Sequence, residues 1–161
     1  MSGTAINGIH HVGMSVPSLE RARAFYVDLL GMTELGAHGG WRDSAQMDRL
    51  TRLQGTAARM MFLAAGNLFL EMFEYSAPPP PPIIHERGVH EYGFTHLCID
   101  VNDTDAIHAR LTAAGMDFHC DPISASGVRT VYGRDPFGNV IELQQIVTED
   151  VVKRVPALAG R

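Results

Sequence analysis

The hexapeptide HVGMSV, residues 11–16, decides the fold, because a second segment, HLCIDV at residues 96–101, repeats its pattern. Each begins with histidine and ends with valine, with apolar residues at its second and fourth positions. Self-similarity of this kind predicts two copies of one supersecondary unit. The alternation in each copy predicts a β-strand whose histidine lies on the face opposite the apolar residues.

A helix is expected after each copy. Residues 18–31 (SLERARAFYVDLLG) and residues 104–115 (TDAIHARLTAAG) each carry an apolar stripe. Ser18 and either Asn102 or Asp103 are candidate N-caps, while Gly31 and Gly115 suit the left-handed position past each helix end. The stripes consist of Leu19, Ala22, Phe25, Tyr26, Leu29 and Leu30 in the first helix and Ile107, Leu111 and Ala114 in the second.

Strand-like segments follow each helix, so both halves read βαβββ. They are residues 32–38, 57–65 and 68–75 in the first half and 116–122, 128–135 and 139–147 in the second. A polar insert at residues 43–54, to which Trp41, Arg42 and Asp48 are assigned as lid or surface cover, is expected to hold a short helix. We predict an α+β fold of two tandem βαβββ modules, residues 6–76 and 93–147. A proline-rich extended linker at 77–92 joins them, and a C-terminal tail covers 148–161.

Composition favours a small molecule as the partner. The net charge is −5, from 13 basic and 18 acidic residues, and the absence of a basic run speaks against nucleic acid or an anionic membrane surface. The start lacks the features of a signal peptide and the apolar runs are too short to cross a bilayer, so we expect a cytoplasmic protein. Cys98 and Cys120 are then expected as free thiols.

Two histidines and two glutamates recur at equivalent places. Glu71 in LEM and Glu142 in IEL each stand between large apolar residues on the last strand of a module, where a buried carboxylate is costly without a partner. With His11 and His96 they predict a site for one divalent transition ion, for which nickel, cobalt, manganese, iron and zinc are all admissible. The alternative is hydrogen-bonded core histidines with glutamates at solvent-facing strand edges.

Further residues share strand faces with these four. Phe69, Phe73 and Tyr75 have the parity of Glu71 and form either an apolar wall for a ligand or part of the core. Arg129 and Tyr132 have opposite parity, so at most one of them can face the site. The predicted substrate contacts are Phe69, Phe73, Tyr75, Cys98 and Arg129.

Two motifs resemble the vicinal oxygen chelate superfamily, which includes glyoxalase I, methylmalonyl-CoA epimerase, extradiol dioxygenases and the fosfomycin and bleomycin resistance proteins. The resemblance covers residues 6–147 and rests on HHVGMSVPSLERARAFYVDLLGM (10–32) and GRDPFGNVIELQQ (133–145). It implies a cupped, barrel-like mixed sheet with helices outside and a homodimer. It also matches His11, Glu71, His96 and Glu142 to the four metal-ligand positions, a pattern most similar to bacterial glyoxalase I.

The resemblance implies a divalent-metal-dependent enzyme that chelates vicinal oxygens of its substrate and moves a proton, as an isomerase, lyase or epimerase. Glu142 is the first candidate base and Glu71 the second. Four protein ligands leave too few open positions for an extradiol-type dioxygenase. Ser15 and Tyr75 replace the arginine and asparagine expected for glutathione recognition, which disfavours a glutathione adduct. The alternative is a metal-free dimer that sequesters an antibiotic-like small molecule.

Overall fold

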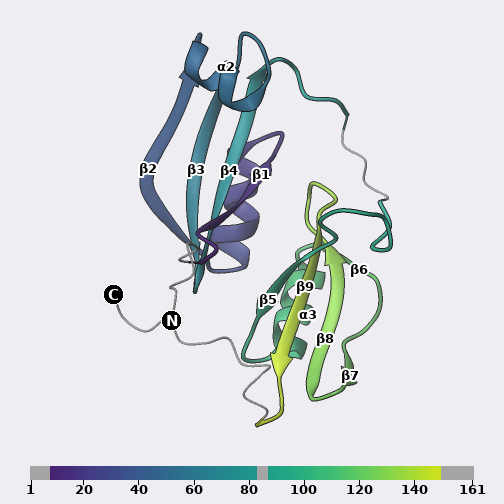
Figure 1. Cartoon of the computed structure of the whole chain (residues 1–161). Coiled ribbons are helices and arrows are strands. Elements are labelled where there is room, and N and C mark those ends of the chain that lie inside the picture. The colour runs from purple at the N-terminus through teal and green to yellow at the C-terminus, as the bar shows by residue number, and fades with distance from the viewer. Residues whose placement is uncertain (1–7, 83–86, 150–161) are drawn as a thin grey trace, which may run out of the picture. The chain divides into compact units, whose positions relative to one another are not determined.

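The computed structural model describes residues 8–82 and 87–149 (Figure 1). The chain divides into two compact units, residues 1–81 and 82–161, and each is described by itself. The division falls inside the segment predicted as the linker. Both units combine a helix with a mixed sheet, which confirms the predicted α+β fold of tandem βαβββ modules.

The first unit contains a four-stranded sheet in the order β1-β4-β3-β2. Its edge strand β1 runs parallel to β4, whereas the other neighbours are antiparallel. The first and last strands of the module therefore lie side by side. The elements are β1 (His11–Ser15), α1 (Leu19–Arg23), η1 (Ala24–Leu29), β2 (Thr33–Arg42), α2 (Ala45–Thr51), β3 (Ala57–Ala65) and β4 (Leu68–Ala77).

The second unit repeats this plan with one additional short strand. The order β5-β9-β8-β6 again places the first strand parallel to the last, and β7 pairs with β8. The elements are β5 (Leu97–Asp100), α3 (Thr104–Ala113), β6 (Asp117–Phe118), β7 (Ile123–Ala125), β8 (Val128–Arg134) and β9 (Val140–Ile146). Figure 1 shows α3 lying along one face of this sheet, in agreement with its contacts to β8 and β9.

The predicted helix signals are confirmed. The Ser18 side chain accepts a hydrogen bond from the Arg21 N–H, and Asp103, rather than Asn102, caps α3 in the same way. Gly31 and Gly115 have φ values of 81° and 90°, a conformation that glycine adopts without strain. The first helix continues past α1 as the wider turns of η1.

The core of each unit lies between the helix and one sheet face. Alternate residues of β4 and β9 are buried there, and the intervening residues, which include Glu71 and Glu142, lie on the opposite face. Leu111 is buried as predicted, but Ala114 is exposed and does not belong to the stripe. The side chains buried in the two cores include Leu19, Ala22, Phe25, Tyr26, Met61, Leu63, Leu70, Met72, Leu111, Val131, Ile141 and Leu143.

Two strands differ from the expectation. β2 extends to Arg42 and includes Trp41, because an irregularity in register between Leu35 and Gly39 lets the pairing with β3 continue past the glycines. β7 was not predicted. Cys98 and Cys120 are free thiols, as expected. Over the described residues, no helix has both the length and the apolar character needed to span a membrane.

Candidate metal and substrate site

The first unit brings one predicted histidine and one predicted glutamate together. His11 begins β1, and the parallel register sets Gly13 of β1 opposite Glu71 of β4. The Nε2 atom of His11 lies 3.1 Å from Oε2 of Glu71. The carboxylate side chain is only 16% exposed, so the imidazole is its main polar partner within the unit. This pair lies on the sheet face opposite α1.

The second unit repeats the same contact with the same atoms. His96 immediately precedes β5, and the register sets Cys98 opposite Glu142 of β9. The distance from Nε2 of His96 to Oε2 of Glu142 is again 3.1 Å, and the glutamate side chain is 12% exposed. The two pairs are therefore equivalent in strand position, atoms and separation. Their recurrence argues against the alternative of glutamates at solvent-facing edges.

Hydroxyl and thiol groups surround the second pair. Thr130 Oγ1 donates to Glu142 Oε1 over 2.7 Å, and the Tyr132 hydroxyl lies 3.5 Å from His96 Nε2. Desolvation, and secondarily the negative charge of Glu142, raise the pKa of the Cys98 thiol to about 12. The same two causes raise the pKa of the Tyr132 hydroxyl. Neutral donors therefore gather around the Glu142 carboxylate.

Apolar groups take the equivalent places around the first pair. Phe62 stands opposite Glu71 in register, as Tyr132 stands opposite Glu142, and its ring contacts His11 edge-on at 6.3 Å between centroids. Met60, two residues earlier, corresponds to Thr130. Among the residues that the structure describes, no hydroxyl group bonds to Glu71 as Thr130 bonds to Glu142. The two glutamates are equivalent in position but different in surroundings.

An aromatic cluster lies farther along the first sheet on the same face as Glu71. The ring of Trp41 lies 5.8 Å from Phe73 and 5.7 Å from Tyr75, in edge-to-face arrangements. The indole Nε1 donates to Thr56 Oγ1 over 2.8 Å, and that hydroxyl donates to Asp48 Oδ1 over 2.6 Å. Trp41 belongs to this cluster rather than to a lid, which corrects its assignment to the insert.

The remaining predicted contacts are placed differently. Phe69 shares the face of Glu71, but its ring packs against His10 at 5.2 Å between centroids. Arg129 points to the helix side, where its Nη2 lies 2.6 Å from Oδ1 of Asp105 on α3. Arg129 is therefore not a neighbour of the His96–Glu142 pair, and its prediction as a substrate contact is corrected. Of the two alternatives, Tyr132 faces the pair, because it stands opposite Glu142 in the β8–β9 register and its hydroxyl reaches His96.

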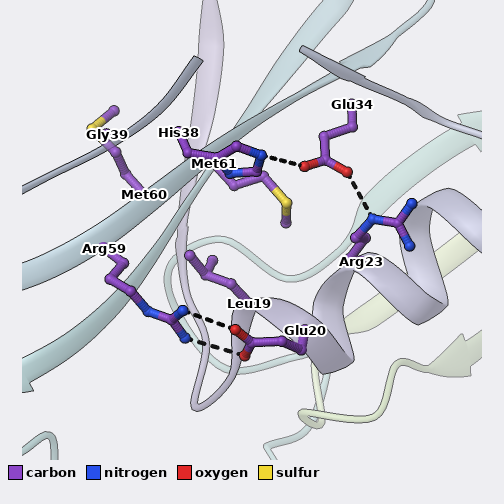
Figure 2. Close-up of a pocket in the computed structure, with 9 residues that line it drawn as sticks. All are labelled: Leu19, Glu20, Arg23, Glu34, His38, Gly39, Arg59, Met60 and Met61. Carbon is purple, nitrogen blue, oxygen red and sulfur yellow. Dashed lines mark hydrogen bonds and ion pairs between the residues drawn. The ribbon is translucent and has the colours of Figure 1, made fainter. Parts of the chain in front are cut away.

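A pocket on the helix side of the first unit is occupied by ion pairs (Figure 2). Arg59 Nη1 lies 2.8 Å from Glu20 Oε1, and Glu34 binds both Arg23 and His38 at 2.8 Å. The charged groups that line it thus satisfy one another across the groove between α1 and the sheet. Since neither His11 nor Glu71 lines this pocket, we assign it to helix docking rather than to catalysis.

The geometry of each pair fits a shared cation. When an imidazole nitrogen and a carboxylate oxygen each bind one ion at about 2.1 Å, and the angle between the two bonds at the ion is a right angle, the two atoms lie about 3.0 Å apart. The observed 3.1 Å matches this separation, although it also suits an N–H···O hydrogen bond. Within either unit, over the described residues, no group of three or more His, Cys, Asp or Glu side chains could hold an ion. Each unit therefore places one histidine and one glutamate in contact.

The chain is a protein of two tandem βαβββ modules. Each module pairs one histidine with one glutamate on the sheet face away from its helix. The model of the Glyoxalase/Bleomycin resistance protein/Dioxygenase superfamily matches residues 8–143, and the chain belongs to this superfamily. The resemblance in the two sequence motifs is thereby confirmed.

Two curated relatives are epimerases. A 2-epi-5-epi-valiolone epimerase from Actinomyces sp. is 34% identical over 160 residues, covering 89% of this chain and 83% of the relative. The mitochondrial methylmalonyl-CoA epimerase of Mus musculus is 26% identical over 141 residues, covering 85% of this chain and 72% of the relative. These similarities support an enzyme of the superfamily.

Solved structures share the fold. A glyoxalase family protein from Bacillus cereus matches with a TM-score of 0.81 and 20% identity over 92% of this chain and 99% of its own. A fosfomycin resistance protein from Listeria monocytogenes, complexed with Mn(II) and sulfate, matches with a TM-score of 0.61 and 19% identity over 92% and 99% of the two chains. A divalent ion therefore occurs in one protein of this fold.

Proposed function

We propose that this chain is a divalent-metal-dependent epimerase, in which His11, Glu71, His96 and Glu142 bind one ion. The observation that carries the proposal is the repeated His–Glu pair, with the same atoms at the same 3.1 Å in both units. Two imidazoles and two carboxylates suit nickel, cobalt, manganese, iron or zinc. When bound, such an ion polarises the substrate's carbonyl and adjacent oxygen, so that removal of a neighbouring proton costs less.

The residues' own part is to move that proton. Epimerisation breaks a C–H bond beside a carbonyl, passes the proton to a base, and returns a proton to the opposite face of the carbon. Glu142 and Glu71, two carboxylates in different environments, are the candidates for the proton acceptor and the proton donor. Glu142 is our first candidate for the base.

The substrate that we propose is a polyhydroxylated cyclic ketone. The Actinomyces relative is named as an epimerase of 2-epi-5-epi-valiolone, whose ending denotes a ketone. In this chain, Phe73 and Tyr75, together with Trp41, offer aromatic faces on which the C–H side of such a ring can stack. Ser15 and Tyr75 lack the charge and amide that the glyoxalase resemblance associates with glutathione. We further propose that the protein acts as a homodimer in the cytoplasm.

Metal content is the first test. Plasma mass spectrometry on tag-free protein should give about one divalent transition ion per chain, and the double variant His96→Ala, Glu142→Gln should lose it. Thr112→Val on the exposed surface of α3 is the matched control and should retain the ion. No ion in the wild-type protein, even after reconstitution, would contradict the proposal and favour a metal-free dimer that sequesters a small molecule.

Solvent exchange tests the reaction itself. Incubation of 2-epi-5-epi-valiolone with the metal-loaded protein in D₂O should place deuterium at the carbon beside the carbonyl, visible by NMR as loss of the proton signal and appearance of the epimer. Glu142→Gln should abolish the exchange. Binding of the ketone without any exchange by the metal-loaded protein would refute the epimerase assignment and leave a binding role.

A further inference from the structure

The residue that precedes each pair histidine contacts the same ring nitrogen. His10 Nδ1 lies 3.0 Å from His11 Nδ1, and Thr95 Oγ1 lies 2.9 Å from His96 Nδ1. The two contacts occur in separate units, and the contacting residues differ in type. Their shared feature is the Nδ1 atom of the histidine that faces a glutamate through Nε2. The repeat therefore extends to one residue beyond each His–Glu pair.

This contact determines which nitrogen each histidine presents. A neutral imidazole has one N–H and one lone pair, and a hydrogen bond at one nitrogen selects the tautomer and the ring orientation. In the tautomer whose Nδ1–H donates to the preceding side chain, the lone pair is on Nε2, where a cation shared with the glutamate oxygen would bind it. Ligand histidines in proteins commonly use their second nitrogen in this way.

We propose that His10 and Thr95 are positioning residues that orient His11 and His96 so that both offer Nε2 to the cation. This inference rests on the proposed function, since it assigns outer partners to the proposed ligands. It also explains the adjacent histidines of the opening motif, because the first of them positions the second. The two residues have the same role and come from different chemical types.

His10 is itself held in place by β4. Its backbone carbonyl accepts a hydrogen bond from Phe69 N–H over 3.3 Å, which extends the parallel ladder by one step. Its ring packs against the Phe69 ring at 5.2 Å between centroids, with 52° between the planes. Phe69 therefore fixes the position of His10 through its ring and its backbone N–H. This contact gives a structural reason for an aromatic residue two positions before Glu71. Thr95 is half-buried two residues before β5, and its short side chain has fewer rotamers than that of His10.

Metal affinity of matched variants tests this assignment. Zinc is titrated into apo protein against a chromophoric chelator for wild type, Thr95→Val, Thr95→Ser, His10→Ala, His10→Asn and the surface control Thr112→Val. We expect Kd to rise about 10-fold or more in Thr95→Val and His10→Ala. Thr95→Ser should restore wild-type affinity and His10→Asn part of it, since both keep a hydrogen-bonding group. Thr112→Val should not change Kd.

NMR of the zinc-loaded protein gives a readout that a merely structural role would not move. Long-range ¹H–¹⁵N correlations should show Nδ1-protonated rings for His11 and His96 in the wild type, with Nδ1–H protons slow to exchange. In Thr95→Val the His96 Nδ1–H should exchange faster while that of His11 is unchanged, and His10→Ala should give the reverse. Equal exchange in all proteins would overturn the proposal.

Failure of this inference can be distinguished from failure of the proposed function. If wild-type protein binds no zinc, the proposed function fails and the positioning role fails with it. If wild type binds zinc and both Thr95→Val and His10→Ala bind it equally well, the positioning role alone is refuted. Should either variant not fold, by circular dichroism, the variant in the other unit decides, because each unit makes the same prediction.

Discussion

The proposed ligand role of Glu142 predicts that its hydrogen bond with Thr130 contributes measurably to cation affinity. Thr130 Oγ1 donates to Oε1 over 2.7 Å, whereas Oε2 faces His96 at 3.1 Å, so the two carboxylate oxygens have different partners. The substitution Thr130→Val keeps the branched shape and removes the hydroxyl. His96 is then the remaining partner of the carboxylate, and nothing holds Oε1, so the carboxylate group can rotate away from His96.

The expected loss follows from the burial of the acceptor. The Glu142 side chain is 12% exposed, so water replaces the missing donor poorly. A hydrogen bond to a charged group contributes about 1.5–3 kcal/mol. Loss of an outer partner of a metal ligand lowers affinity about 10–100-fold, which corresponds to about 1.4–2.7 kcal/mol. We therefore expect the Kd for zinc to rise at least about 10-fold.

The assay is competition with a chromophoric chelator at fixed pH, with circular dichroism as a check on folding. Thr130→Ser keeps the donor and should bind zinc like the wild type. Thr112→Val makes the same chemical change on the exposed side of α3 and should have no effect. A folded Thr130→Val protein with a Kd within a factor of about two of wild type would refute the reasoning, because the hydrogen bond would then make no contribution to zinc affinity.

Three further results are expected. In metal-free protein, Cys98 should react slowly with iodoacetamide at pH 8 although the residue is exposed, since its local surroundings and the charge of Glu142 raise the pKa of its thiol to about 12; Glu142→Gln should accelerate the reaction measured by mass spectrometry. Hydrogen bonds from a threonine hydroxyl and two backbone N–H groups lower the pKa of Asp48, so its stabilising effect is present above the ordinary carboxyl pKa and lost as pH falls through the folded value. Fluorescence of Trp41, the one tryptophan of the chain, should report that loss at low pH and in Asp48→Asn at neutral pH, and identical acid titrations of the two proteins would contradict it. Leu111→Ala should lower the free energy of unfolding of the second unit, measured with urea, by about 2–5 kcal/mol. A smaller loss would mean that the neighbouring core residues move to fill the cavity left by the leucine side chain.

Strand parity explains why so much of the fold could be predicted. Successive side chains point to opposite faces whatever strand pairs with them, so HVGMSV and LEM were enough to put His11 and Glu71 on one face. The caps at Ser18 and Gly31 are equally local. β7 gave no such signal, because Ile123–Ala125 are three exposed residues without alternating burial. The glycines at residues 39–40 read as a loop, and this hid the extension of β2 to Trp41.

The outer contacts of the site depend on register, which a single sequence does not provide. That Thr130 reaches Glu142, or that Arg129 turns to Asp105, follows only once β8 is aligned with β9 and packed beneath α3. Strand parity alone shows that at most one of Arg129 and Tyr132 can face the site. The choice required knowing which face of β8 the helix covers.

The parallel pairing of the first and last strands also determines when each His–Glu pair can form. His11 and Glu71 lie at opposite ends of the first module, so the segment between them must close into a loop before β4 can join β1. A chain still being synthesised exposes the histidine well before its carboxylate has left the ribosome. The His11–Glu71 contact therefore forms only after β4 has joined β1, and an interrupted chain that ends within β3 would lack the carboxylate that His11 contacts.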